Sequence, residues 1–370
     1  MQKPEAVVLY RKYRPSLFSE VVGQDHVVTV LKNALTLGRV AHGYLFSGTR
    51  GTGKTTLARL LAKAYNCEKR GKDGEPCNTC TMCKEFSAGR ALDLIEIDAA
   101  SNRGIDEIRE LRDSVRFTPG SAKRKVYIID EVHMLTKEAF NALLKTLEEP
   151  PEHAMFILAT TEPEKVPDTI KSRVQHFEFR RVSGEKLHER LHTLLKAEKY
   201  KLADDALGLL AFLADGSIRD GESMLGQLMD AFPSGADKDS LEQLFGLPQI
   251  EIIHTLIDRA LGRDPKGILD SMKQIAEKGI DAKMLGRLLI NETKILFLSL
   301  LDPREIDRIK KEFSDVHAAF FESHKTADKK HVLYLLTKLI EAFQSGYRGM
   351  LQELPIELAL LDAADDKAEK

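Results

Sequence analysis

The sequence predicts an α/β P-loop module that carries a four-cysteine insert and is followed by helical domains. Three observations predict this fold class. Gly48–Thr55 matches the phosphate-loop pattern G-x-x-x-x-G-K-[ST] and lies between an apolar run and a helical segment. Further along the chain, an apolar strand pattern ends in two carboxylates, Asp130 and Glu131. After Ser183 the strand patterns give way to helical periodicity.

The composition indicates a globular chain of more than one domain without a strong overall charge. Its 370 residues exceed the usual size of one domain, so we expect two or three. The formal net charge is −2, so any contact with nucleic acid must come from a local patch. No uncharged apolar stretch approaches the roughly 18 residues of a membrane helix, and Met1–Glu5 lacks the apolar core of a signal peptide. We therefore expect a cytoplasmic protein.

The glycine-rich stretch has the context that a phosphate loop needs. Gly43–Ser47 should form a strand, and Thr56–Ala64 should form the helix after the loop. Glycines let backbone N–H groups turn toward an anion, and the helix N-terminus adds the positive end of its dipole. Lys54 should reach the β- and γ-phosphates, and Thr55 should ligate Mg²⁺. A glycine-rich turn with an unrelated lysine is the disfavoured alternative. The expected nucleotide ligands are Gly48, Thr49, Arg50, Gly51, Thr52, Gly53, Lys54, Thr55 and Thr56.

Residues 8–24 precede the loop and could fold over the adenine. The Arg14-Pro15 pair interrupts any helix there, and apolar side chains follow it. An N-terminal arm that only packs on the core is the alternative. A helix should then run over His26–Leu37 and end at Gly38. The expected base contacts are Tyr10, Arg14, Pro15 and Val22.

The four cysteines, Cys67, Cys77, Cys80 and Cys83, lie within one short segment. This is not the pattern of a disulfide-stapled secreted domain. Four thiolates at these intervals fit a closed tetrahedral Zn²⁺ site, which is structural rather than catalytic. The loop between the first two is rich in Lys, Gly and Pro, and metal ligation would supply the missing order, on the order of 10–16 kcal/mol in zinc peptides. An iron–sulfur cluster, whose usual spacings differ, and free thiols are the alternatives.

Two further strands complete the predicted site. Leu92–Asp98 alternates as a strand does, and a helix is expected over Ile105–Phe117. The apolar strand Val126–Asp130 then presents its carboxylates at the C-terminal end, where open α/β sheets bind ligands. Asp130 is placed to hold Mg²⁺ through water. Glu131 is placed to orient or deprotonate the attacking water.

A helix over Lys137–Leu147 and a buried strand over Ala154–Thr161 follow. The hydroxyl of Thr161 could contact the γ-phosphate or the attacking water, or it could only cap the next turn. The residues alone leave both possibilities open. A short helix over Val166–Lys171 precedes Arg173.

From Ser183 onward the chain should be helical. Amphipathic helices are expected over Glu185–Lys199 and Asp204–Asp215, and another should start after Gly216. The most apolar helix, Met284–Leu301, should be either core or an oligomer seam. The charged tail 363–370 should be disordered, or a linker cut short, in which case the natural chain continues.

These segments closely resemble the gamma/tau subunits of the bacterial DNA polymerase III clamp loader, which are AAA+ ATPases. The four-cysteine insert inside an AAA+ module is the most specific common feature. The resemblance covers about residues 5 to 360 and weakens toward the C-terminal end. The matching pieces are Tyr13-Arg14-Pro15, Gly48–Thr55, the four cysteines, Leu94–Ser101, Asp130–His133, Phe140–Pro151, Leu158–Pro163, Ser172-Arg173 and Gly216–Asp220.

The resemblance implies a domain plan. It places an AAA+ ATPase domain over residues 1–179 with its zinc insert at 67–83. A small helical lid domain would cover 180–242, and an all-α collar domain for oligomerisation would cover 243–362.

The resemblance also implies roles for single residues. Ser172-Arg173 would belong to a Ser-Arg-Cys motif whose arginine inserts into a neighbouring subunit's ATP site. Val174 stands where the motif has Cys, which leaves the arginine in place. Arg219 would be the sensor-2 arginine, which reads the γ-phosphate in its own subunit, and Thr161 would be sensor 1. Ordinary surface salt bridges are the alternative for both arginines.

The implied function is ATP-driven clamp loading during DNA replication. Several copies would join the related delta and delta-prime subunits in an open five-membered ring. ATP binding would open the sliding clamp and grip primer–template DNA, and hydrolysis would release the clamp onto the DNA. The implied cofactors are ATP, Mg²⁺ and Zn²⁺. Contacts to DNA phosphates would come from Ser101, Asn102, Arg103 and Lys145, although Lys145 could equally face solvent.

Other classes of function compete with this one. Members of the family are grouped with the DNA-directed DNA polymerase holoenzyme, but nothing in this chain resembles a polymerase active site. An inert scaffold subunit would bind ATP weakly or not at all, and the intact Lys54, Thr55, Asp130 and Glu131 argue against it. The cysteine insert and the collar argue against an AAA+ motor for branch migration or helicase loading.

Overall fold

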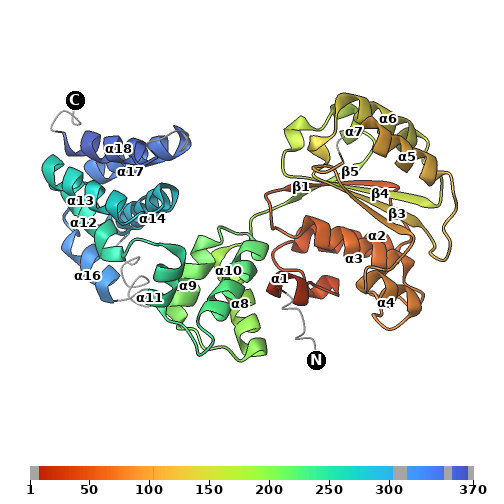
Figure 1. Ribbon diagram of the computed structural model, residues 1–370, viewed down its shortest axis with the longest axis horizontal. Helices are drawn as coiled ribbons and strands as arrows, with labels where there is room; N and C mark the ends of the chain where they lie inside the picture. Colours follow the sequence, from red (N-terminus) through yellow and green to blue (C-terminus); the bar gives the residue numbers. More distant parts are fainter. Residues whose placement is uncertain (1–7, 103, 303–314, 346–351, 366–370) are drawn as a thin grey trace. The chain divides into compact units, whose positions relative to one another are not determined.

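A computed structural model describes residues 8–102, 104–302, 315–345 and 352–365. Its contacts divide the chain into two compact units. The first contains Met1–Tyr200 and Leu207–Gln227, and the second contains Lys201–Ala206 and Leu228–Lys370. An α/β layer structure forms most of the first unit, and helices form the described part of the second (Figure 1).

A five-stranded parallel sheet is the centre of the first unit. The strands are β1 (Gly43–Gly48), β2 (Leu94–Asp98), β3 (Lys125–Asp130), β4 (Ala154–Thr160) and β5 (Gln175–Phe179). Their spatial order is β2-β3-β4-β1-β5, and every neighbouring pair is parallel. Because all strands run the same way, the loop after β1 and the carboxylates that end β3 open toward the same edge of the sheet.

Helices cover both faces of this sheet (Figure 1). One face carries α2 (Asp25–Thr36), α3 (Lys54–Asn66) and α4 (Thr81–Ser87), and the other carries α5 (Ile105–Val115), α6 (Lys137–Glu148) and α7 (Asp168–Lys171). The alternation of side chains along β1 explains the two layers: Tyr44 and Phe46 are buried in the first core, whereas Leu45 between them is buried in the second. This unit also contains α1 (Leu9–Lys12), η1 (Phe18–Glu20), η2 (Val132–Met134), η3 (Pro163–Lys165) and α8 (Gly184–Glu198).

Two helices, α9 (Asp204–Leu213) and α10 (Ile218–Ala231), contain residues of both units. The second unit continues with α11 (Lys238–Phe245), α12 (Ile250–Leu261), α13 (Pro265–Glu277), α14 (Ala282–Leu301), α16 (Asp315–Ser323), α17 (Lys329–Ser345) and α18 (Leu354–Ala364). The most apolar predicted helix is α14. It packs against α12 and α17 and buries Leu285, Leu289 and Leu296 completely, so it is a core helix of this unit. Within the described ranges, no helix is long and apolar enough to cross a membrane.

The predicted fold class is confirmed, and the predicted elements recur within a few residues of their expected bounds. The sequence patterns do not predict β5, because this edge strand offers only two apolar residues, Phe177 and Phe179, among exposed polar ones. The short helix predicted from Val166 begins only at Asp168. Val166 is extended, with ψ 126°, because a residue before proline avoids the helical region.

The predicted disordered tail is wrong at its start. Helix α18 extends to Ala364, and both Ala363 and Ala364 are buried. The run of small and apolar residues in Leu354–Ala364 therefore packs as a helix in spite of the charges that follow it. Residues 366–370 of the predicted tail lie outside the described residues.

A buried carboxylate, that of Asp93, fixes the loop before β3. Its oxygens accept hydrogen bonds from the backbone N–H groups of Gly120 (3.0 Å), Ser121 (3.0 Å) and Ala122 (2.9 Å). Burial by itself would raise the pKa of Asp93, but these three N–H groups and the nearby Lys125 lower it overall. The loop thus depends on the ionised form of this side chain.

An Asp93→Asn variant should lose about 1–3 kcal/mol of stability at neutral pH, because the amide presents N–H groups where acceptors are needed. The pKa of Asp93 in the folded chain lies below its unfolded value of about 3.9. Its stabilisation is therefore present above that value and is lost as the pH falls through the folded pKa. Urea unfolding should show a wild-type advantage that is constant from about pH 7 to about pH 5 and shrinks as the pH falls further, toward about 3. Asp113→Asn, at an exposed position on α5, is the control, and an advantage independent of pH would contradict this role.

Candidate functional site

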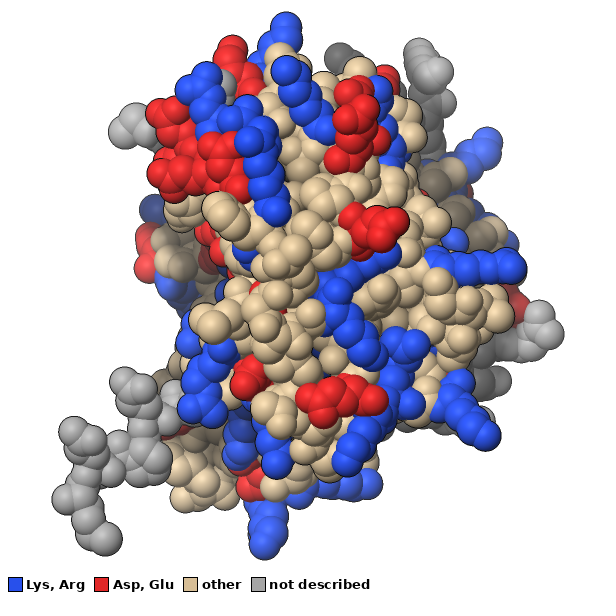
Figure 2. Space-filling model, turned by 90° about the vertical axis from the view of Figure 1, so that its right-hand side faces the viewer, with Lys and Arg blue, Asp and Glu red and all other residues tan. Residues whose placement is uncertain are grey.

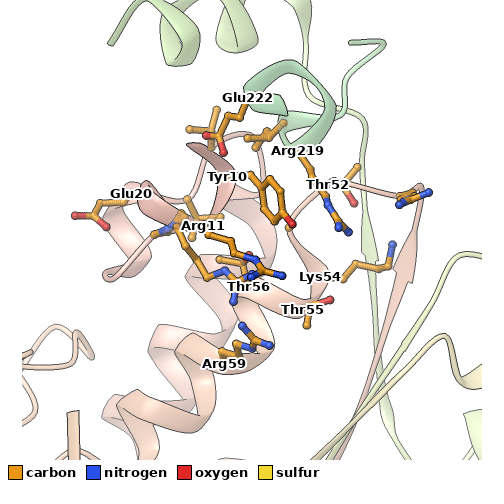
Figure 3. A pocket seen from close by; sticks show the side chains of 18 of the residues that line it. Tyr10, Arg11, Glu20, Thr52, Lys54, Thr55, Thr56, Arg59, Arg219 and Glu222 are labelled. Atoms are coloured by element: carbon orange, nitrogen blue, oxygen red, sulfur yellow. The ribbon is translucent and has the colours of Figure 1, made fainter. Parts of the chain in front are cut away.

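A pocket in the first unit collects most of the predicted nucleotide ligands. Its lining comes from the N-terminal segment, the glycine loop, the end of β3 and the start of α10, and Figure 3 shows these side chains converging. Gly48, Thr49 and Thr161 adjoin the lining without being part of it, and Arg173 is also outside it. The predicted residues that line the pocket are Tyr10, Arg14, Pro15, Val22, Arg50, Gly51, Thr52, Gly53, Lys54, Thr55, Thr56, Asp130, Glu131 and Arg219.

The glycine loop needs glycine for two separate reasons. Gly48 and Gly51 have positive φ values of 137° and 78°, which other residues rarely adopt. A Cβ at Gly48 would lie 2.3 Å from the carbonyl oxygen of Phe179, and one at Gly51 would lie 1.9 Å from the hydroxyl oxygen of Ser217. The loop is therefore closed between β5 and the segment before α10. Its backbone can form the concave arrangement of N–H groups that binds an anion.

Lys54 starts α3 and is buried. Its ammonium group donates hydrogen bonds to the carbonyl oxygens of Gly48 (2.7 Å) and Thr49 (2.9 Å). Burial lowers the pKa of Lys54, and the charges of Glu131 and Asp130 only partly oppose that effect. A phosphate group in the loop would add the negative charge that favours the ammonium form.

The hydroxyl of Thr55 donates a 2.7 Å hydrogen bond to Oδ2 of Asp130, which joins the start of α3 to the end of β3. The other carboxylate oxygen of Asp130 accepts the backbone N–H of Glu131 at 3.0 Å. A hydroxyl and a carboxylate beside a phosphate loop form the donor set that Mg²⁺ prefers in nucleotide sites. The residues present therefore fit a magnesium ion held directly by Thr55 and through water by Asp130.

Glu131 has the left-handed backbone conformation, with φ 49°, and its side chain is held from two sides. The Thr161 hydroxyl donates to Oε2 of Glu131 at 3.1 Å, and Nδ1 of His133 lies 3.5 Å from the same oxygen. The next turn is capped by Thr160, whose hydroxyl oxygen accepts the N–H of Glu162. Thr161 is thus directed at the predicted catalytic carboxylate. Sequence reasoning assigned no role to His133, although it lies in the Asp130–His133 motif.

The predicted sensor-2 residue, Arg219, extends from α10 toward the glycine loop (Figure 3). Its guanidinium lies 4.8 Å from the centre of the Tyr10 ring, and its backbone N–H donates to the carbonyl of Gly51. Arg11 and then Arg219 lower the pKa of the Tyr10 hydroxyl by hydrogen bonding. This part of the pocket therefore carries an excess of positive charge, as a polyphosphate site requires.

Two buried interactions that support the pocket were missed by sequence reasoning. Arg190 of α8 donates to Glu222 of α10 (2.9 Å) and to the carbonyl of Tyr13 (2.7 Å), which ties the N-terminal segment to two helices. Burial raises the pKa of Glu222, and Arg190 partly opposes this. The fully buried Gln24 donates to the carbonyl oxygen of Arg180 (2.7 Å) and accepts the N–H of the same residue (3.1 Å). No local sequence pattern marks any of these pairs.

Arg173 follows α7, where its guanidinium is held by its own chain. It contacts Glu148 at 2.5 Å and donates to the carbonyl of Thr169 (2.7 Å) and the hydroxyl of Ser172 (3.2 Å). Its side chain is one-third exposed, at 33%. The surface salt bridge considered above is thus present, and a role at another subunit stays a prediction.

The predicted DNA contacts are scattered over the first unit. Ser101 and Asn102 follow β2 and hydrogen-bond to Asp98, and Lys145 is exposed on α6. Arg103 lies outside the described residues. Figure 2 shows one face on which Lys and Arg side chains predominate below, while most of the acidic side chains lie above. Charge is thus unevenly distributed in spite of the small net charge.

The cysteine sulfurs lie in one cluster, as the spacing predicts. All four Sγ atoms lie within 4.8 Å of one another, close to the separation of about 3.8 Å expected around a tetrahedral Zn²⁺ with Zn–S bonds of about 2.3 Å. Backbone N–H groups donate to three of the sulfurs, as hydrogen bonds to thiolates do: Cys77 to Cys67, Cys80 to Cys77 and Cys83 to Cys80. Burial raises the pKa of Cys67 and Cys83, whereas hydrogen bonding, first of all with Thr79, lowers the pKa of Cys77 to about 5. The cluster is compatible with zinc.

Two family models match consecutive parts of the chain, residues 23–183 and 186–231. A family model described as DNA polymerase III, delta subunit, matches residues 23–183. A second, described as DNA polymerase III clamp loader subunit, ATPase lid domain, matches residues 186–231.

Curated relatives of this chain are named as DNA polymerase III subunits. The DNA polymerase III subunit tau of Bacillus subtilis is 54% identical over 59% of this chain and 39% of its own length. The subunit tau of Escherichia coli is 44% identical over 76% of this chain and 44% of its own length. The subunit gamma of Buchnera aphidicola subsp. Schizaphis graminum is 42% identical over 74% of this chain and 75% of its own length. The chain thus matches less than half the length of these two tau subunits and three quarters of the gamma subunit.

The purified chain should contain about one equivalent of zinc, the number that a single four-thiolate site binds. Removal of the metal should loosen residues 67–83, because residues 68–76 contribute little apolar packing of their own. Hydrogen exchange should therefore accelerate in this insert while the glycine loop stays protected. Elemental analysis that finds iron and sulfide would support an iron–sulfur cluster at these cysteines. A purified chain without metal would support free thiols.

Proposed function

The chain belongs to the DNA polymerase III gamma/tau family, and we propose that it is an ATP-hydrolysing subunit of a bacterial clamp loader. One observation carries this proposal. A single pocket brings together the glycine loop with Lys54, the Thr55–Asp130 pair and Glu131, which are the phosphate-binding, metal-binding and water-orienting groups that one chain must supply for hydrolysis of a nucleoside triphosphate.

In this proposal, the triphosphate lies along the glycine loop and the base lies against Tyr10, Pro15 and Val22. Lys54 exchanges its loop carbonyl partners for the β- and γ-phosphates. Mg²⁺, when bound by Thr55 and Asp130, neutralises charge on the phosphate oxygens. Zn²⁺ at the four cysteines is structural and takes no part in the reaction.

Glu131 orients a water molecule and accepts its proton as the water oxygen attacks the γ-phosphorus. The bond from the γ-phosphorus to the bridging oxygen breaks, and ADP leaves with that oxygen. Thr161 supports this step by holding Glu131, because its hydroxyl donates a hydrogen bond to the Glu131 carboxylate. Arg219 stabilises charge on the γ-phosphate from the same chain.

Assembly completes the proposed site. Arg173 is outside the pocket of its own chain, which supports a role at the pocket of a neighbouring subunit. The partners are other copies of this chain, delta and delta-prime subunits, the sliding clamp and primer–template DNA, all in the cytoplasm. We keep the division into ATPase, lid and collar domains as part of this proposal. Leu298 and Leu301 are exposed on α14 and offer apolar surface for a collar seam.

The alternatives are weaker. A scaffold subunit that does not bind ATP has no need for the Thr55–Asp130 pair or for a buried lysine in the loop. A branch-migration or helicase-loading motor is disfavoured because the curated relatives are DNA polymerase III subunits.

Lys54→Ala and Glu131→Gln should separate binding from turnover. Loss of the Lys54 ammonium should raise the Kd for ATP about 10- to 150-fold, the equivalent of about 1.5–3 kcal/mol for hydrogen bonds to a charged group, and should abolish hydrolysis. Glu131→Gln should keep the affinity and stop turnover, because the amide cannot accept the proton of the water. Isothermal titration and phosphate release measure the two effects. Unchanged ATP affinity in Lys54→Ala would refute the phosphate-loop assignment, and normal cycling by Glu131→Gln would refute its catalytic role.

Arg173→Ala should leave ATP binding by the isolated chain unchanged, because its own pocket is intact. In the assembled complex with clamp and primed DNA, the stimulated ATPase should collapse. Arginines that act in this way contribute about 10³–10⁵ in rate in GTPases. Lys171→Ala, which removes a neighbouring cation on α7, is the matched control. Complexes that mix Arg173→Ala chains with Lys54→Ala chains should recover activity only at interfaces where an intact Arg173 faces an intact Lys54. Full turnover by a complex of Arg173→Ala chains alone would exclude the inter-subunit mechanism.

A further inference from the structure

The N-terminal segment that lines the pocket is held in place by the cysteine insert. Pro15 on one side and Glu20, Val21 and Val22 on the other line the pocket. Between them, Ser16, Phe18 and Ser19 contact residues of the insert and of α3. The wall of the pocket and the metal-binding loop are therefore adjacent parts of one layer.

Glu75, in the insert, makes two of these contacts. Its carboxylate accepts the backbone N–H of Phe18 at 2.7 Å and that of Ser19 at 3.0 Å, one on each oxygen. Both residues begin η1, and the first N–H groups of a helical turn have no partner within it. Lys32 of α2 adds an ion pair to the same carboxylate at 3.0 Å, and the Glu75 side chain is only 13% exposed. Glu75 thus caps η1 through charge-assisted hydrogen bonds.

A second contact lies closer to the metal site. Lys63, buried on α3, donates to the carbonyl of Ser16 (2.8 Å) and to Oδ1 of Asn78 (2.7 Å). Asn78 lies between Cys77 and Cys80 and has a left-handed backbone with φ 56°. The position of Ser16 is therefore tied to the conformation of the segment that holds two of the sulfurs.

Packing joins the same two regions. The Phe18 side chain is 1% exposed and belongs to the core cluster that contains Cys67, Cys80 and Cys83. The insert thus contacts Phe18 of η1 both by hydrogen bonding and by apolar packing.

We propose that Glu75 is a positioning residue for nucleotide binding, through which the metal-bound insert holds the base-side wall of the pocket. This inference rests on the proposed function, because it takes the pocket as a nucleoside triphosphate site. Metal ligation fixes the insert, the insert places Glu75, and Glu75 fixes the backbone of Phe18 and Ser19 ahead of Glu20–Val22. Glu75 has no part in the glycine loop. The coupling therefore acts on affinity for the nucleoside and not for the phosphates.

The test compares two ligands on the full chain. Isothermal titration with Mg²⁺ would measure the Kd for ATP and for inorganic tripolyphosphate. Glu75→Gln keeps the size of the side chain but leaves one acceptor oxygen for two donors. We expect a five- to tenfold rise in the Kd for ATP, about the net loss of one ordinary hydrogen bond, and no change for tripolyphosphate. Glu68→Gln, an exposed residue of the same insert with the same change of charge, should alter neither.

Metal removal is a second experiment. It needs no substitution, so it tests the inference even if a variant fails to fold. Wild-type chain without metal should lose ATP affinity to a similar extent and keep its tripolyphosphate affinity. Glu75→Gln should respond less to metal removal than wild type does, because the link is already broken. Unchanged ATP affinity in both experiments would overturn the inference, and so would an equal loss for both ligands, which would indicate general unfolding. Wild-type chain that binds neither ligand would instead refute the proposed function itself.

Discussion

The close backbone contacts at Gly48 and Gly51 are the constraint on which the pocket depends. At these positions a side chain would collide with the carbonyl of Phe179 and the hydroxyl of Ser217. The loop can therefore close against β5 and the segment that begins α10. That closure brings Arg219 next to Gly51 and orders the N–H groups of the loop. A single steric requirement thus shapes the glycine loop and places Arg219 beside it.

The charges around this loop are arranged for a ligand that brings negative charge. Lys54 is buried among carbonyl oxygens, and Arg219 and Arg11 crowd the Tyr10 hydroxyl. Asp130 and Glu131 stand at the opposite side, each held by a hydroxyl, that of Thr55 or Thr161. Cations therefore surround the glycine loop, and the carboxylates lie at the end of β3. One pocket thus contains both the cations that suit a triphosphate and the carboxylates that suit a metal ion and an attacking water.

The insert adds order where the chain lacks apolar residues. Its polar loop cannot fold by burial, so the cysteines, Glu75 and Asn78 supply specific contacts instead. These contacts end on η1 and not on the glycine loop. The structure therefore links the cysteine cluster to the side of the pocket that is lined by Pro15, Val21 and Val22.

The sequence by itself determined the chemistry that depends on neighbours along the chain. The glycine loop, the Asp130-Glu131 pair and the four cysteines each lie within a short segment, so spacing alone indicates the kind of ligand that each of them suits. Tertiary structure alone decided which distant residues support them. Glu75 and Phe18 are 57 residues apart, Arg190 and Glu222 are 32 apart, and Gln24 and Arg180 are 156 apart. The edge strand β5 likewise has its place only through pairing with β1. Such contacts follow from the packing of whole layers, and no periodicity or local spacing records them.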